Sequence, residues 1–135
     1  MASFEDVAAL ISGLPDTTEG ERHGNRTWFV NKQGFAWERP FTKADVRRFG
    51  ERGVTPPAGP ILAVRVADMI EKAAVLAAGT KGIFDMAHFE GYPAVLIQLD
   101  RIGKRALKVA IEDAWLACAS TKQADTYMSR PASRR

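Results

Sequence analysis

The segment His88-Phe89-Glu90-Gly91-Tyr92-Pro93 places a histidine and a tyrosine in a turn that leads into an apolar strand. Histidine can act as a base or a switch near neutral pH. No nucleophile lies close to it in the sequence, and the one cysteine, Cys118, falls on an apolar helix stripe where a buried thiol is inert. We therefore expect His88 to hydrogen-bond the loop backbone, Gly91 to supply a positive φ and Tyr92-Pro93 to aim the strand. No catalytic residue is predicted, and the chain is expected not to be an enzyme.

A cluster of cations at the start of the last predicted helix is a second candidate site. Cations there oppose the helix dipole, but the free backbone N–H groups of the same turn favour an anion. Two further cations at the first predicted hairpin could form a counterpart on a wing. The predicted nucleic-acid contacts are therefore Arg26, Lys32, Arg101, Lys104, Arg105 and Lys108. The alternative is that these side chains are ordinary solvated surface.

Trp37, Arg65 and Gln98 form a third candidate, a ligand-binding face of the sheet. If residues 62, 64 and 66 point towards the helices, Arg65 points to the opposite, outer face. Gln98 is predicted on that same face, and Trp28 or Trp37 could join it. An arginine, an amide and a tryptophan on an open sheet suit base stacking and phosphate contact. The alternative is that the C-terminal tail or a second subunit covers this partly apolar surface.

Composition limits the classes of function. The chain has 135 residues and a net charge of +3, but three arginines lie in its last six residues. Without them the 19 basic residues fall to 16, equal to the 16 acidic residues, so nucleic-acid binding by the body would be weak and salt-sensitive. Two histidines and one cysteine are too few for a structural zinc site, and no cofactor motif is present. The sequence shows no signal peptide and no membrane-length apolar run, so a cytoplasmic protein is expected.

Hydrophobic periodicity and turn residues predict the order of the elements. Helices are expected over about 4–13, 43–49 and 69–78, each preceded by a capping residue, and over about 104–119, where apolar residues form one stripe. Strands are expected over 26–30, 35–39, 61–66, 83–85 and 94–99, and a further strand over 16–22 is an open alternative. Residues 31–34 are predicted as the turn of a hairpin.

Short strands joined by hairpins favour an antiparallel sheet, and the main helices are expected to cover one face of it. The prediction is a two-layer α+β fold. Residues 1–120 are expected to form a single domain, and residues 121–135 a basic, partly disordered tail.

Four segments together resemble the MmcQ/YjbR family. They are Gly34-Phe35-Ala36-Trp37-Glu38-Arg39-Pro40, Ile61-Leu62-Ala63-Val64-Arg65-Val66, His88-Phe89-Glu90-Gly91-Tyr92-Pro93-Ala94-Val95-Leu96-Ile97 and Glu112-Asp113-Ala114-Trp115. They occur in the family's order. The chain departs from the pattern at Asp85-Met86-Ala87, where Thr-Pro is expected before the histidine, and in its arginine tail.

The resemblance implies a CyaY-like fold and a DNA-binding protein that uses a double wing, and it implies no catalytic residues. The expected function is therefore non-enzymatic binding of DNA through hairpin wings and a basic helix start. The alternative is a module that binds a small molecule or a protein partner on the open sheet face. A homodimer is compatible with either interpretation.

Overall fold

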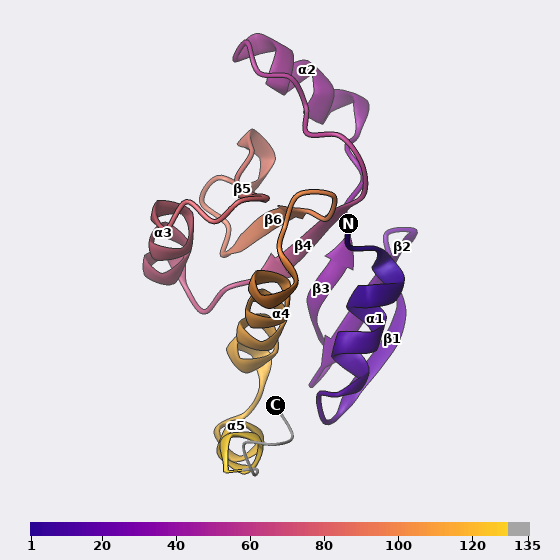
Figure 1. Cartoon of the computed structure of the whole chain (residues 1–135), viewed down its shortest axis with the longest axis vertical. Coiled ribbons are helices and arrows are strands. Elements are labelled where there is room, and N and C mark those ends of the chain that lie inside the picture. Colours follow the sequence, from indigo (N-terminus) through magenta and orange to yellow (C-terminus); the bar gives the residue numbers. More distant parts are fainter. Residues whose placement is uncertain (130–135) are drawn as a thin grey trace.

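A computed structural model describes residues 1–129 (Figure 1). One six-stranded sheet has the order β1-β2-β3-β4-β6-β5, and every neighbouring pair is antiparallel. The predicted α+β class is confirmed. The further strand that the sequence leaves as an alternative over 16–22 is also present, as the first strand of the sheet. The elements are α1 Phe4–Ser12, β1 Thr17–Arg22, β2 Asn25–Val30, β3 Gln33–Glu38, α2 Lys43–Glu51, β4 Ile61–Arg65, α3 Met69–Ala77, β5 Ile83–Phe84, the 3₁₀ turn η1 Ala87–Phe89, β6 Ala94–Gln98, α4 Lys104–Cys118 and α5 Thr121–Met128.

Capping side chains start α1, α2 and α3 where the sequence predicts them. Ser3 and Asp6 close a reciprocal capping box on α1, and Thr42 and Asp45 close one on α2. At α3 the Asp68 carboxylate accepts the backbone N–H of Glu71 at 2.8 Å. Each cap satisfies N–H groups that the helix itself leaves without partners.

The β2–β3 turn is tighter than predicted. Asn31 and Lys32 alone make the turn, with φ of 52° and 67°, so Gly34 lies inside β3. Two residues with positive φ suffice for a hairpin whose twist matches its strands. The Asn31 side chain donates to the Cys118 carbonyl oxygen at 3.2 Å and to Gln123 Oε1 at 2.6 Å, which ties the turn to the C-terminal helices.

The main core lies between one face of the sheet and the helices α1 and α4, which lie side by side in front of it (Figure 1). Leu62, Val64 and Val66 point into this core, as the strand alternation predicts. Trp28 is buried here too, so the outer face receives Trp37 and not Trp28. At the far end of the core, Trp115 Nε1 donates to the Pro15 carbonyl oxygen at 3.0 Å.

A second, smaller core lies on the outer face. Phe49 of α2, Met86 and Phe89 of the η1 region pack over apolar residues of β4 and β6. The short helix α2 is thus the exception to the predicted packing of helices on one face, because its Phe49 packs on the outer-facing apolar residues of the sheet. This second core covers the β4–β6–β5 half of the outer face and leaves the β1–β2–β3 half uncovered.

The folded part of the chain extends beyond the predicted boundary at residue 120. Residues 121–128 form α5, which Ser120 and Gln123 cap, and Tyr127 is buried against Trp115 with ring centroids 5.2 Å apart. The Tyr127 hydroxyl donates to a Glu112 carboxylate oxygen. The predicted tail therefore begins with a helix, because a capping box and one aromatic anchor suffice to dock it. Residues 130–135 lie outside the described residues.

Within residues 1–129, no helix is both long and apolar enough to cross a membrane.

Candidate functional site

A hollow of about 650 Å³ lies over the uncovered half of the outer sheet face. Four cationic side chains line it, from Arg22, Lys32, Arg39 and Arg65, and no Asp or Glu among residues 1–129 does so. Trp37, Phe41 and Tyr92 supply aromatic surface. Ligand sites of this size usually combine apolar walls with a few convergent polar groups. The lining therefore favours an anion with an apolar or aromatic part.

Arg22, at the end of β1, reaches across β2 towards β3. Its guanidinium carbon lies 5.1 Å from the centroid of the Phe29 ring. A β-carbon at Gly34 would lie 3.5 Å from Arg22 Nη1 and 3.0 Å from the Thr27 methyl carbon. The absence of a side chain at Gly34 thus leaves the space over β3 in which the Arg22 guanidinium lies, stacked on Phe29.

Arg65, at the end of β4, lies against Tyr92 on the opposite wall. Its guanidinium carbon is 5.5 Å from the ring centroid, and Nη1 donates to the Tyr92 hydroxyl oxygen at 3.3 Å. The Nε atom is buried and has no hydrogen-bond partner among the described residues. An unsatisfied buried donor on a charged group costs free energy.

Of the four cations, only Arg39 is neutralised. Its Nη1 lies 2.9 Å from the buried Asp45 carboxylate, which also accepts the Thr42 backbone N–H at 2.8 Å. Burial opposes ionisation of Asp45, but these two donors outweigh it and hold the pKa of the carboxyl below its usual value. Arg22, Lys32 and Arg65 form no ion pair with any residue of the described part. The hollow therefore carries three uncompensated positive charges.

Trp37 forms part of the floor of the hollow and is half-buried. Phe89 supports its ring from the second core, with centroids 6.3 Å apart and planes 29° apart. On β2 its cross-strand partner is Thr27, and on β4 its partner is Ala63, so only short side chains flank it. A planar group could therefore approach the ring of Trp37 closely.

Lys72 of α3 fixes the turn that carries Tyr92. Its Nζ atom donates to the carbonyl oxygens of Phe89 at 2.7 Å and Tyr92 at 2.8 Å, and lies 3.1 Å from Asp85 Oδ1. Lys72 is only 3% exposed, whereas Ile70 on the same helix is 83% exposed. The sequence analysis missed this lysine, because its four-carbon chain is buried among apolar neighbours while its charge meets backbone oxygens.

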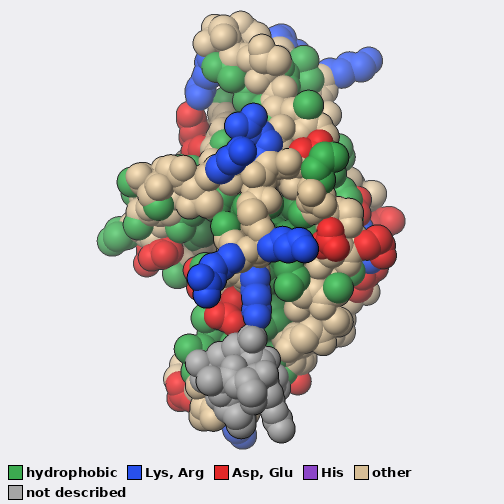
Figure 2. Space-filling model, viewed as in Figure 1, with side chains coloured by type: hydrophobic (Ala, Val, Ile, Leu, Met, Phe, Trp, Pro, Cys, Tyr) green, Lys and Arg blue, Asp and Glu red, His purple; other side chains and the backbone are tan. Residues whose placement is uncertain are grey.

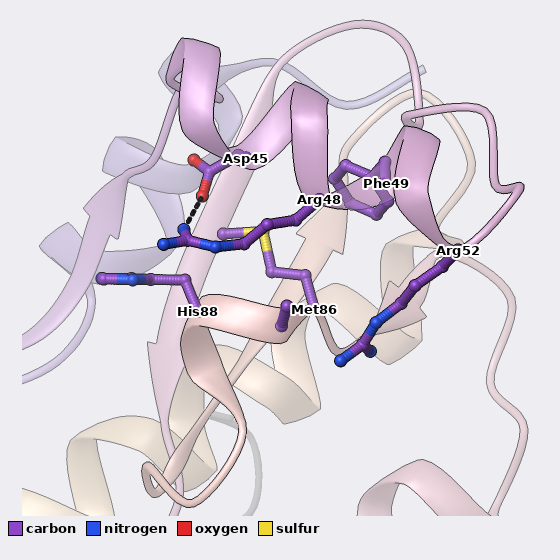
Figure 3. Close-up of a pocket in the computed structure, with 7 residues that line it drawn as sticks. Asp45, Arg48, Phe49, Arg52, Met86 and His88 are labelled. Carbon is purple, nitrogen blue, oxygen red and sulfur yellow. Dashed lines mark ion pairs between the residues drawn. The ribbon is translucent and has the colours of Figure 1, made fainter.

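His88 does not hold the turn as predicted. Its side chain is exposed and makes no hydrogen bond within residues 1–129, because Lys72 already satisfies the turn carbonyls. In Figure 3, His88 lies beside Arg48, which pairs with Asp45 at 3.8 Å. The depression that they line holds only about 10 Å³, barely space for one water molecule. Gly91 has the predicted positive φ, at 80°.

The predicted wing residues point in different directions. Arg26 lies on the core side of β2, where its guanidinium pairs with Glu19 at 2.9 Å and Glu5 at 3.0 Å. The hydrogen bonds that Arg26 donates to Glu19 and Glu5 raise its pKa further, so both of its ionic partners lie within the fold. Lys32 lies on the other side and lines the hollow. Arg26 and Lys32 therefore do not form one basic surface.

The basic start of α4 lies on the helical side of the sheet, opposite the hollow. Lys and Arg side chains gather in the middle of this face, and acidic side chains gather to one side of it (Figure 2). The exposed cations at the start of α4 are Arg101, Lys104, Arg105 and Lys108, and none forms an ion pair in the described part. The sheet separates this strip from Lys32.

Gln98 is not part of the candidate ligand face. Its amide nitrogen donates to the Ala58 carbonyl oxygen at 2.8 Å, which secures the loop before β4. The β4–β6 register pairs Gln98 with Ile61 and Arg65 with Ala94, so the two side chains stand at opposite ends of the strand pair. The structure brings Trp37 and Arg65 together and adds Arg22. A β-carbon at Gly20, two residues earlier in β1, would lie 3.3 Å from the Phe29 ring, so strand alternation puts Arg22 on the same face as that ring.

No three or more His, Cys, Asp or Glu side chains gather as a possible metal site within residues 1–129.

The chain is similar along almost all of its length to three mycobacterial proteins. It is 39% identical over 129 residues to the uncharacterized protein Mb2600 of Mycobacterium bovis and to the uncharacterized proteins MT2646 and Rv2570 of Mycobacterium tuberculosis. The alignment covers 96% of this chain and 98% of each relative, so the chain belongs to the family of these mycobacterial proteins. No family model matches the chain, and no solved structure matches it.

Proposed function

We propose that this protein is a non-enzymatic binding protein that holds an anionic ligand in the hollow over β1–β3. The observation that carries the proposal is the set of three unpaired cations, Arg22, Lys32 and Arg65, around a hollow without acidic lining in the described part. Positive charges placed together repel one another, and their field attracts anions. The resemblance to the MmcQ/YjbR family supports a binding role without catalytic residues.

Isothermal titration calorimetry with a panel of small anions would test this proposal. At least one phosphate or carboxylate compound should bind, and its affinity should fall as salt is added. Arg65→Gln should weaken binding about tenfold or more, because a charge-assisted hydrogen bond contributes about 1.5–3 kcal/mol. Arg47→Gln is the matched control, since Arg47 is exposed on α2 and lies outside the hollow. Equal affinity of both variants would refute the assigned site.

DNA is the second candidate ligand, and the exposed cations on α4 favour it. Four cations over eight residues, without carboxylate partners in the described part, present a short strip to a phosphate backbone. Fluorescence anisotropy with duplex and single-stranded DNA at low and physiological salt would test it. Replacing Lys104, Arg105 and Lys108 by glutamine should abolish salt-sensitive binding.

The C-terminal arginines need their own control in the DNA experiment. A full chain with glutamine at positions 130, 134 and 135 should bind DNA as the wild type does if α4 is the contact. Binding that disappears in this variant, and persists in the α4 variant, would reject the α4 strip as the DNA site.

A further inference from the structure

Building on the proposed anion site, we infer that its ligand is a nucleoside phosphate, with the aromatic base on Trp37 and the phosphate among Arg22, Lys32 and Arg65. The class follows from three features of the hollow. They are one exposed ring face on the floor, a cluster of unpaired cations within the same hollow, and amide and hydroxyl side chains on the walls.

The indole ring of Trp37 gives the floor of the hollow a flat aromatic surface. The second core supports Trp37 through Phe89, so the indole face is held before a ligand arrives. Phe41 and Tyr92 line the same hollow, and Tyr92 is 41% exposed. Aromatic side chains fixed in this way stack on nucleic-acid bases without regard to base identity. A purely aliphatic anion would leave this ring surface unused.

The three unpaired cations of the hollow favour a ligand that carries more than one negative charge. A monocarboxylate would compensate one of the three cations, whereas a nucleoside mono- or diphosphate carries two or three negative charges. Two of the three are arginines, whose planar guanidinium groups match phosphate oxygens in pairs. Arg22 and Arg65 are each held by an aromatic ring, at 5.1 Å and 5.5 Å, so little ordering of these side chains is needed on binding.

The remaining polar lining suits the sugar and the edge of a base. Asn25, Gln33 and Thr42 line the hollow and carry amides and a hydroxyl, which donate as well as accept hydrogen bonds. No carboxylate from residues 1–129 reaches the lining, so a cationic ligand would find no counter-charge. These side chains can form hydrogen bonds with the polar edges of a sugar or a base, and they do not repel a phosphate.

Tryptophan fluorescence provides a direct test with the full chain. Trp28 and Trp115 are 2% and 0% exposed, so a ligand in the hollow should change the emission of Trp37. The four nucleoside 5′-monophosphates and ADP should be titrated against adenosine, inorganic phosphate and pyrophosphate. At least one nucleotide should bind ten or more times more tightly than either adenosine or inorganic phosphate.

Calorimetry with two variants separates the ring from the phosphate. Trp37→Leu should weaken nucleotide binding about tenfold and leave pyrophosphate binding unchanged, whereas Arg65→Gln should weaken both. Trp37→Phe, which keeps a ring, should bind nucleotide nearly as the wild type does, and its melting temperature shows whether the fold is retained.

The outcomes distinguish this inference from the proposed function. If pyrophosphate or a di- or tricarboxylate binds as tightly as any nucleotide, the base contact is refuted while the anion site stands. If no anion binds, both fall. If a single-stranded oligonucleotide binds but mononucleotides do not, the nucleoside phosphate is replaced by a strand of nucleic acid.

Discussion

The two halves of the outer sheet face differ in what covers them. The β4–β6–β5 half carries Ile61, Ala63, Ala94 and Leu96, and the chain covers it with its own α2 and η1 segments. The β1–β3 half carries Thr27, Gly34 and Trp37 with arginines at its edges, and no described segment lies over it. The first half is an apolar core, and the second is a basic hollow.

This difference separates residues that stabilise the fold from residues that are free to bind. Apolar area on the covered half contributes about 25 cal/mol per Å² removed from water. The cations of the open half repel one another and contribute no ion pair to the fold in the described part. We therefore expect substitutions in the covered half to change stability and those in the open half to change binding.

The largest effect is expected from Phe89→Ala. Phe89 is buried in the second core and contacts the rings of Trp37 and Tyr92. Truncating such a side chain leaves a cavity, and the free energy of unfolding should fall by about 3–5 kcal/mol. Urea denaturation measures it. Phe29→Ala, in the open half, is the matched control and should cost about 1 kcal/mol, because that ring is half-exposed. Equal losses would remove the distinction between the halves.

Lys72→Met should have the next largest effect. The methionine keeps the apolar contacts of the stem but leaves two carbonyl oxygens without their buried donor. We expect a loss of about 2–3 kcal/mol, together with faster amide hydrogen exchange around Tyr92. Lys81→Met, at an exposed position, should leave both quantities unchanged. Unaltered exchange at Tyr92 in Lys72→Met would show that another contact holds the turn.

The Asp45–Arg39 pair joins the two halves, and its effect should depend on pH. Because the folded pKa of Asp45 lies below its ordinary value of 3.8, the charged form stabilises the fold above that value. This stabilisation is lost as the pH falls through the folded pKa. Asp45→Asn should therefore cost about 1–2 kcal/mol between pH 5 and 8, with the difference shrinking below about pH 4. Val46→Ala, at an exposed position of the same helix without a titratable group, should show no such trend. A constant difference at all pH values for Asp45→Asn would contradict the assignment.

The smallest change in stability is expected from Arg65→Gln. The arginine forms no ion pair in the described part and one long hydrogen bond, to the Tyr92 hydroxyl at 3.3 Å, so its loss should alter the free energy of unfolding by no more than about 1 kcal/mol. Ligand affinity should fall in the same variant. A large loss of stability would instead assign Arg65 to the structural half.

Much of the fold could be predicted from the sequence, because capping boxes, periodicity and turn residues act over a few positions. α5 escaped prediction, since one buried tyrosine on a distant tryptophan decides whether it docks. Alternation placed Arg65 and Gln98 on the correct face, and left Trp28 or Trp37 as the tryptophan that joins them. It could not show that Gln98 lies far from Arg65, because that separation depends on the β4–β6 register, which links residues 29 to 37 positions apart.

The candidate site was only partly predictable for a related reason. Arg22 belongs to a strand that the sequence left open, and its guanidinium meets Phe29 across the sheet. Arg26 resembles a wing cation in sequence, yet Glu5 and Glu19 neutralise it from two other elements. Charge counts along the chain give the number of cations but do not identify which of them remain unpaired.

The anchoring of Asn31 has a consequence for the order in which the site forms during synthesis. The ribosome makes residue 31 well before Gln123, which follows 92 residues later. At bacterial and eukaryotic elongation rates this interval is on the order of 5–20 s. For nearly all of this interval the β2–β3 hairpin, with Lys32 at its tip, lacks both partners of the Asn31 side chain, because Cys118 follows 87 residues after Asn31. The turn that carries Lys32 is thus anchored only when nearly all of the folded chain has been made.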